Sequence, residues 1–141
     1  MDEKNKYLLK LLQQNARESI SSLARKLNLS RTAVQERIHK LENQGIIAGY
    51  TVKLNTEYEK RQIKAWVTMR TKQKLNRQVV AELSKIEEIT SLRTVSGVYD
   101  LIATVLADST DAMDDVLDRM GTTTGVEKTQ SSIVLSIKFE R

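Results

Sequence analysis

Basic and polar side chains recur at helical spacing between Ser30 and Lys40, and their chemistry suits the reading of DNA. Arg can bond to guanine through two hydrogen bonds, Gln can do so to adenine, and hydroxyl groups bond to bases or phosphates. We expect Arg31, Thr32, Gln35 and His39 to reach base edges, with Lys40 and Ser21 or Ser22 nearer the phosphates. The full candidate set is Ser21, Ser22, Ser30, Arg31, Thr32, Gln35, Glu36, His39 and Lys40. The same spacing is also typical of an ordinary amphipathic helix with a solvated face.

The elements that would position these side chains are two short helices joined by a tight turn. In the first helix, Leu23 and Leu27 lie four residues apart on one face, and Ser19 can cap its start. Asn28 tolerates the left-handed conformation that ends a helix, and Ser30 can cap the second helix. The inward stripe of the second helix consists of Val34, Ile38 and Leu41. This pattern predicts a helix-turn-helix whose second helix enters the major groove.

The distribution of charge favours a polyanionic partner for the first half of the chain. The sequence carries a formal net charge of +5 and has a pI near 9.5. Residues 1–62 contain twelve Lys or Arg and seven Asp or Glu, whereas residues 63–141 contain eleven of each. All of the excess positive charge therefore lies in the half that holds the helix pair, where it can neutralise phosphates of double-stranded DNA.

Composition limits the other classes of function. The chain has 40% hydrophobic and 29% charged residues, which predicts a folded protein. The absence of Cys and the single His argue against a metal site, and we expect no cofactor. The acidic run over 108–118 lacks the Gly and the closing Glu of a calcium loop and suits a helix start. No apolar run approaches membrane-spanning length, and no nucleophile–base pair or phosphate loop is visible. We expect a cytoplasmic protein that has no membrane partner and is not an enzyme.

The chain divides after residue 55. We predict a helix over Lys4–Gln14, then the helix pair, then a helix stop at Gly45 and a strand pair or short hairpin over Ile46–Leu54 that pivots at Gly49. Residues 56–62 are polar and suit a linker. Residues 1–55 are therefore predicted to form a winged helix-turn-helix DNA-binding domain.

The hydrophobic pattern of residues 63–141 is that of a domain with both strands and helices. Apolar patterning predicts strands over residues 63–69, 89–95, 101–107 and 133–139. Helical spacing predicts helices over 75–86 and 113–120, the second capped by Asp108 or Ser109. The order βαββαβ is that of a ferredoxin-like domain. The predicted fold class is thus α+β, with a winged helix-turn-helix domain followed by a ferredoxin-like domain.

The pattern of this second domain predicts that copies of the chain associate. Two helices can cover only one face of a four-stranded sheet, and the third and fourth strands have apolar residues on both faces, as at Leu101, Ile102, Val134 and Leu135. The uncovered face would be an exposed apolar patch that monomers seldom carry. Sheet-to-sheet pairing with a second copy would bury it, and a two-fold dimer would present two recognition helices to a palindromic site.

Taken together, these motifs resemble the Lrp/AsnC (leucine-responsive, or feast/famine) family of transcriptional regulators. The resemblance covers the whole chain and is carried by Leu23–Tyr50, Gly97–Asp100 and Gly125–Leu135. It implies sequence-specific DNA binding, homodimers that associate further, often to octamers, and an amino-acid effector bound between C-terminal domains. The chain departs from the family pattern at Asn28, where Gly is frequent, and at 130–132, where relatives often carry Arg and an aromatic or branched residue.

The effector site is predicted from the needs of an α-amino acid. Its ammonium group requires an anion or carbonyl, which Asp100 can supply, and its carboxylate requires N–H or hydroxyl donors. The resemblance places the family's effector pocket near these segments. The candidate effector-binding residues are Gly97, Tyr99, Asp100, Ser131 and Ser132. A structural role is the alternative, with Gly97 in a tight turn, Asp100 in a local backbone bond and the serines at a strand edge.

Three functions remain open at this point. The first is a ligand-responsive transcription regulator, which is our prediction. The second is an architectural DNA-binding protein of the same build without small-molecule control. The third is an enzyme or amino-acid-sensing subunit whose helical head binds protein. Two roles also remain open for Arg37, a contact with a DNA phosphate or a salt bridge with Glu42 or Glu18.

Overall fold

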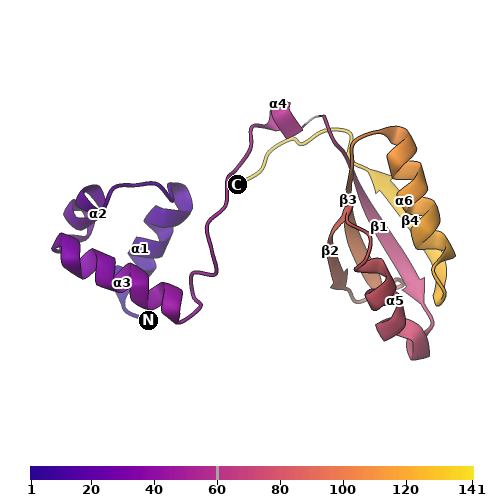
Figure 1. Cartoon of the computed structure of the whole chain (residues 1–141), viewed down its shortest axis with the longest axis horizontal. Coiled ribbons are helices and arrows are strands. Elements are labelled where there is room, and N and C mark those ends of the chain that lie inside the picture. Colours follow the sequence, from indigo (N-terminus) through magenta and orange to yellow (C-terminus); the bar gives the residue numbers. More distant parts are fainter. Residues whose placement is uncertain (60) are drawn as a thin grey trace. The chain divides into compact units, whose positions relative to one another are not determined.

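The computed structural model describes residues 1–59 and 61–141, which form two compact units, Met1–Lys53 and Leu54–Arg141. The first unit is helical, and the second contains a four-stranded sheet with helices (Figure 1). Two separate hydrophobic cores, one in each unit, account for this division.

The helical unit consists of α1 (Glu3–Gln14), α2 (Ile20–Leu27) and α3 (Arg31–Asn43). The two predicted serine caps are confirmed: Ser19 Oγ accepts the Ser22 N–H at 3.1 Å, and Ser30 Oγ accepts the Ala33 N–H at 3.1 Å. Asn28 ends α2 in the left-handed region, with φ 51° and ψ 55°. The three helices enclose a core of Leu8, Leu11, Leu23, Ala24, Leu27, Val34 and Leu41. The helix-turn-helix prediction is therefore confirmed.

The strand pair predicted over Ile46–Leu54 is wrong for this chain. Gly45 follows α3 with φ +69°, but residues 48–55 adopt neither helix nor strand. A strand needs a neighbour to satisfy its backbone N–H and C=O groups, and the described residues supply none here. Tyr50 is held instead by its side chain, whose hydroxyl donates to Glu42 Oε1 at 2.7 Å. The helical unit therefore has no β wing among the described residues.

The second unit follows the predicted order βαββαβ. After a short helix, α4 (Thr56–Glu59), its elements are β1 (Ile63–Thr71), the 3-10 turn η1 (Gln73–Leu75), α5 (Asn76–Leu83), β2 (Ile89–Thr94), β3 (Leu101–Ala107), α6 (Thr110–Thr122) and β4 (Val126–Ile133). The strands lie in the order β2-β3-β1-β4, and every neighbouring pair is antiparallel. Ser109, one of the two predicted caps, accepts the Ala112 N–H at 3.0 Å and starts α6. The ferredoxin-like prediction is confirmed.

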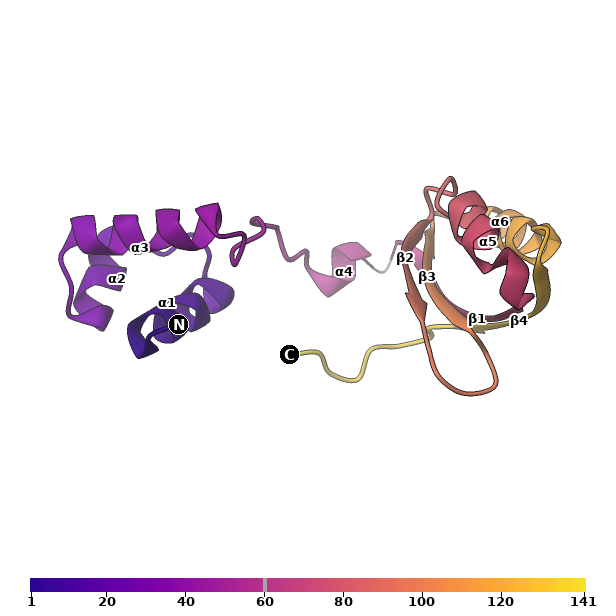
Figure 2. The same cartoon turned by 90° about the horizontal axis from the view of Figure 1, so that it is seen from below.

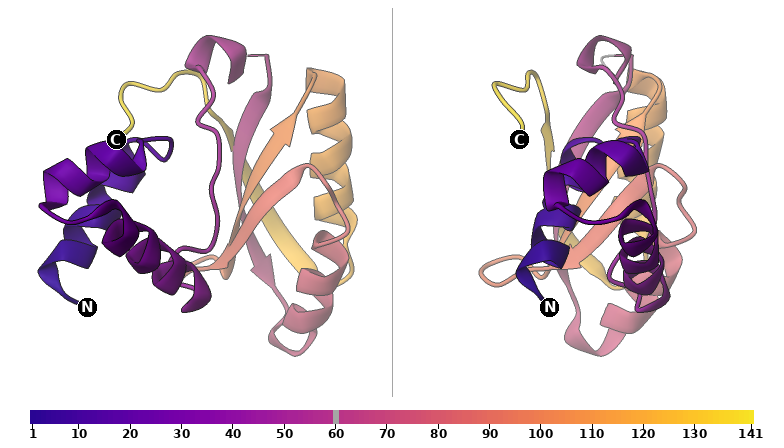
Figure 3. Two further views of the ribbon diagram at one scale, coloured as in Figure 1. Left: turned by 60° about the vertical axis from the view of Figure 1, so that its left-hand side comes forward. Right: turned by 90° about the vertical axis from the view of Figure 1, so that its left-hand side faces the viewer.

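The helices α5 and α6 cover one face of this sheet only. Figure 2 shows both helices on the same side of the strands, and Figure 3 shows that arrangement from two further directions. On β1, Ala65, Val67 and Met69 are fully buried beneath the helices, whereas Trp66 between them is 52% exposed. We call the side that carries Trp66 the open face.

The last strand lies earlier than predicted. Residues 133–139 were expected to form it, but β4 spans Val126–Ile133 and is mostly exposed and polar. Its partner β1 begins at Ile63, and Ala65 already pairs with Ile133. The Val134 N–H still donates to the Lys64 carbonyl, at 2.9 Å, and beyond it only Ile63 of β1 remains. The apolar run that suggested a strand therefore continues as a tail, in which Leu135 is 93% exposed.

This shift also corrects the predicted chemistry of the open face. The fourth strand is not apolar on both sides, because its residues on the open face are polar. The open-face residues of β4 are Lys128, Gln130 and Ser132. The open-face residues of β1 are Lys64, Trp66, Thr68 and Arg70. The open face is therefore mixed in polarity, with apolar side chains from β1 and β3 beside polar ones from β1 and β4.

Candidate DNA-binding face and effector loop

The structure brings the predicted base-contacting residues together on one side of α3. We call this side the recognition face, and its residues are all exposed: Arg31, Thr32, Gln35, Glu36, His39 and Lys40. Val34 and Leu41 lie on the opposite side, where they are almost completely buried against α1 and α2. The hydrophobic core therefore fixes which side chains of α3 point to solvent.

The serines near this face differ in how they are engaged. Ser30 uses an oxygen lone pair to cap α3, which leaves its hydroxyl proton for another acceptor. Ser22 donates its proton to Glu18 Oε1 at 2.6 Å, and Lys26 forms an ion pair with the same carboxylate. These two partners lower the pKa of Glu18, with Lys26 as the larger cause. Ser21 lies half-buried on α2. Ser22 is thus part of an internal network.

Arg37 lies on α3 outside the recognition face and connects that helix to the start of α1. Its guanidinium donates to Asp2 Oδ2 and to Asn5 Oδ1, both at 2.7 Å. Asp2 also caps α1 by accepting the Asn5 N–H at 2.7 Å. The hydrogen bond from Arg37 is the largest cause that holds the pKa of Asp2 below its usual range. The partner is therefore Asp2, and the sequence reasoning that offered Glu42 or Glu18 missed it.

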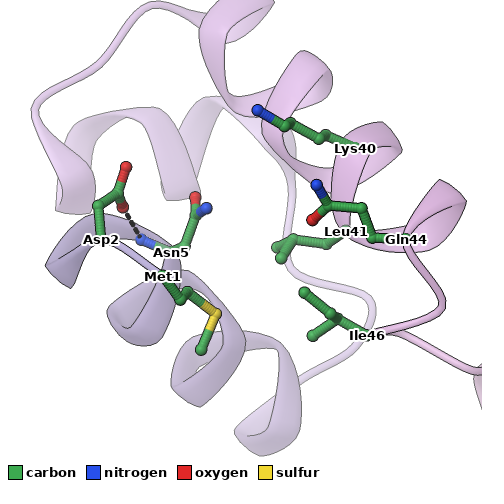
Figure 4. A pocket seen from close by; sticks show the side chains of 7 residues that line it. All are labelled: Met1, Asp2, Asn5, Lys40, Leu41, Gln44 and Ile46. Atoms are coloured by element: carbon green, nitrogen blue, oxygen red, sulfur yellow. Dashed lines mark hydrogen bonds between the residues drawn. The ribbon is translucent and has the colours of Figure 1, made fainter.

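A pocket of about 320 Å³ lies between the start of α1 and the end of α3. Figure 4 shows its residues facing one another from the two sides: Met1, Asp2 and Asn5 on one, Lys40, Leu41, Gln44 and Ile46 on the other. The side chains of Asp2 and Asn5 already accept hydrogen bonds from Arg37. The pocket therefore belongs to the junction that orients α1 against α3.

The turn after β2 brings three of the candidate effector residues to the end of β1. Gly97 has φ +113°, a conformation that favours glycine. The Asp100 N–H donates to the Met69 carbonyl at 2.8 Å, and Asp100 Oδ2 accepts the Thr71 N–H at 2.8 Å. Asp100 is half-buried, and its carboxylate bonds to the backbone of a residue 29 positions earlier in the chain, which differs from the local backbone bond considered as its alternative role. One of its carboxylate oxygens is consequently engaged within the domain.

The two candidate serines lie elsewhere on β4. Ser131 pairs with Val67 and Ser132 pairs with Trp66, so their side chains point to opposite faces of the sheet. The residue of β4 that contacts the turn is Gln130, whose Oε1 accepts the Tyr99 hydroxyl at 2.8 Å. Arg70 Nε donates to the Val98 carbonyl at 3.3 Å. Gln130 and Arg70 were not among the predicted site residues, and only the strand register reveals that they lie beside the turn.

Two structural limits apply to the described part of the chain. No three His, Asp or Glu side chains come close enough there to hold a metal ion. None of the helices described there has the length and apolar character needed to cross a bilayer.

Comparison with known sequences gives two domain matches. Residues 1–42 match the AsnC-type helix-turn-helix domain, and residues 64–141 match the Lrp/AsnC ligand-binding domain. The HTH-type transcriptional regulator LrpA of Pyrococcus horikoshii is 31% identical over 96% of this chain and 96% of its own length. The similarity therefore extends through both units and the segment between them.

Solved structures match over the same extent. AsnC of E. coli superposes with a TM-score of 0.90 at 24% identity and covers 100% of this chain and 96% of its own. The feast or famine regulatory protein of M. tuberculosis, solved in complex with L-methionine, has a TM-score of 0.87 at 31% identity and covers 99% and 95%. The order of elements described above is thus shared with both.

Proposed function

Because the chain belongs to the Lrp/AsnC family of transcriptional regulators, we propose that it binds specific sites in double-stranded DNA through α3 and responds to an amino acid through its sheet domain. Residues 1–55 would form the DNA-binding domain, 56–62 the linker and 63–141 the effector-binding and oligomerisation domain. The observation that carries the DNA-binding assignment is the recognition face, six exposed polar side chains backed by a buried stripe. The protein acts as a regulator in the cytoplasm and not as an enzyme.

We assign the reading of bases to four residues of the recognition face. Arg31, at the start of α3, suits guanine, and Gln35 suits adenine, while Thr32 and His39 supply further donors and acceptors. Lys40 and Ser30 suit phosphates, since Lys is a mobile point charge and the Ser30 hydroxyl proton is not used by its cap. Ser21, Ser22 and Glu36 flank this set. For Ser22 a phosphate contact requires that its bond to Glu18 be exchanged.

We further propose that two copies pair through the part of their open faces around Trp66. The apolar side chains on the open face support this arrangement, because burial of Trp66, Ile102 and Leu106 would remove apolar surface from water. A two-fold dimer also supplies two copies of α3 at a fixed separation. Association of dimers into octamers is the higher-order state that we expect, and sedimentation velocity would test it.

For the effector we propose an amino acid bound near the turn that contains Gly97, Tyr99 and Asp100, with Ser131 or Ser132 reached from a neighbouring copy. A relative of this chain was solved with L-methionine, which supports an amino acid as the class of effector. An architectural role without a small molecule is the second candidate. The departure from the family pattern at residues 130–132 favours that candidate.

The decisive experiment is selection of bound genomic fragments by the full-length protein, followed by fluorescence anisotropy with a selected duplex and a scrambled one. We expect tight binding of the selected duplex only, and a change in affinity when an amino acid is added. Binding that is equal for both duplexes would refute sequence-specific recognition. Binding that no common amino acid alters would support the architectural role instead.

Two variants separate base reading from phosphate contact. Arg31→Ala should cost about 1–3 kcal/mol on the selected duplex and relax its specificity. Lys40→Ala should weaken the binding of all duplexes alike. It should also reduce the salt slope, that is, the slope of the logarithm of the binding constant against the logarithm of the salt concentration, by about one. If Arg31→Ala leaves both affinity and preference unchanged, the assigned orientation of α3 is wrong.

A further inference from the structure

Two cations stand directly opposite each other on the open face. Arg70 of β1 pairs in register with Lys128 of β4, just before the register shift that ends their regular pairing. Opposite residues in an antiparallel pair have Cβ atoms about 5 Å apart, and like charges in that position destabilise the sheet. Both side chains are exposed, and neither takes part in an ion pair among the described residues. Among the described residues, neither cation is therefore paired with a carboxylate.

The side chains next to this pair on the open face of β1 and β4 are polar and uncharged. Gln130 and Thr68 lie one step further along the same face, again in register with each other. We call these four residues, Thr68, Arg70, Lys128 and Gln130, the basic block. The turn after β2 packs beside it, since Arg70 Nε donates to the Val98 carbonyl and Tyr99 donates to Gln130. The only acid in that turn, Asp100, uses one carboxylate oxygen for the Thr71 N–H and forms no ion pair with Arg70 or Lys128 among the described residues.

We propose that the basic block binds the carboxylate of a small-molecule ligand. The Arg70 bond to Val98 uses Nε, so both terminal nitrogens of its guanidinium can meet a carboxylate, while Lys128 adds a point charge from the neighbouring strand. The carbonyl of Val98 and Oε1 of Gln130 are acceptors at the same place and suit an ammonium group. An α-amino acid and a 2-oxo acid both offer the carboxylate. This assignment rests on the proposed effector function. It names the charged side chains that would bind the carboxylate of that effector.

The test is calorimetric titration of the full-length protein with the common L-amino acids and with 2-oxoglutarate. We expect at least one carboxylate to bind, and the carboxamide of the tightest-binding amino acid to bind far more weakly. Arg70→Gln and Lys128→Gln should each weaken binding roughly 10- to 100-fold, the range expected for loss of one charge-assisted hydrogen bond. Lys64→Gln is the matched control, because Lys64 lies on the open face at the far end of β1 and should leave affinity unchanged.

The outcomes distinguish the possibilities. Binding of amino acids alone, or of 2-oxoglutarate as well, identifies the source of the carboxylate and supports the block in either case. If Arg70→Gln binds as tightly as Lys64→Gln, the basic block is not the anchor, although the effector function stands. If no carboxylate binds the unaltered protein, both the anchor and the effector role are refuted, while DNA binding remains. Dissociation of the dimer by Arg70→Gln, without any ligand binding, would show that a partner copy supplies the missing acid and would overturn the proposal.

Discussion

Gly125→Ala should destabilise the sheet domain more than any other alanine substitution at a glycine. Gly125 precedes β4 with φ +101°, and a Cβ at this position would lie 2.8 Å from Val79 Cγ2 and 2.9 Å from Leu75 Cβ. Val79 is fully buried on α5, so it has little room to move away. The close approach of the chain before β4 to the start of α5 therefore requires a residue without a side chain.

The expected size follows from three contributions. Forcing an extra methyl group into a packed core costs about 1–3 kcal/mol, and the left-handed backbone adds about 1–2 kcal/mol for a residue with a Cβ. Alanine also restricts the unfolded chain, which offsets about 0.4–1 kcal/mol. The net loss in the free energy of unfolding should be about 1–5 kcal/mol, with a central value of about 3 kcal/mol.

Two other glycines supply controls that separate these contributions. Gly97 has φ +113° but no heavy atom within 4 Å of a Cβ, so Gly97→Ala carries the backbone cost alone, about 1 kcal/mol after the offset. Gly121 lies inside α6 with open space around it, and Gly121→Ala should stabilise the domain by about 0.5–1 kcal/mol through helix propensity.

Urea denaturation at equal protein concentration measures all three variants. Trp66 is the single tryptophan of the chain and lies on β1, so its fluorescence reports the sheet domain and not the helical unit. The expected order of stability is Gly121→Ala above the unaltered protein, then Gly97→Ala, then Gly125→Ala. A Gly125→Ala protein that is no less stable than Gly97→Ala would refute the packing argument.

Three further predictions concern the helical unit. Ser30→Ala should lower its stability by about 1 kcal/mol, because the Ala33 N–H loses its cap; denaturation followed by far-ultraviolet circular dichroism measures this, and an unchanged midpoint would contradict it. Arg37→Ala should weaken DNA binding without changing its salt slope, since Arg37 bonds to Asp2 and Asn5; a slope reduced by about one would instead identify a phosphate contact. Asp2→Asn should destabilise the unit at neutral pH, and the difference should vanish in acid. Because the pKa of folded Asp2 is lowered, its contribution is complete above the unfolded value of about 3.9 and is lost as the pH falls through the folded value. A difference in chemical denaturation that does not shrink as the pH is lowered below the unfolded value would contradict this.

The parts of the fold that follow from local chemistry could be predicted from the sequence. Ser19 and Ser30 cap helices because their hydroxyls reach N–H groups three residues on, and Asn28 turns the chain because its side chain tolerates a left-handed backbone. The recognition face follows from the period of Val34 and Leu41, which fixes the opposite side of α3.

Contacts between distant residues could not be predicted in this way. Arg37 and Asp2 are 35 residues apart, and either of two closer glutamates satisfied the same electrostatic argument. Gln130 and Arg70 come to lie beside the turn at Gly97 only through the register of β4 on β1. An exposed polar edge strand such as β4 shows little alternation of apolar and polar residues. The last strand was therefore predicted in the more hydrophobic segment that follows β4.

The two segments that were predicted as strands but do not pair, Ile46–Leu54 and the residues after Ile133, share one physical explanation. Tyr50, Val52 and Leu54 alternate with polar residues, and so do Leu135, Ile137 and Phe139; all six side chains are exposed. Alternation is a local property of the sequence, whereas pairing requires a second strand, and among the described residues neither segment has one. If two copies associate through their sheets, as we propose, a second chain provides backbone partners for extended segments and cover for their apolar rows. On that reasoning the disagreement between sequence pattern and single-chain structure is itself a consequence of assembly, because both segments have the composition of strands and lack only a neighbour.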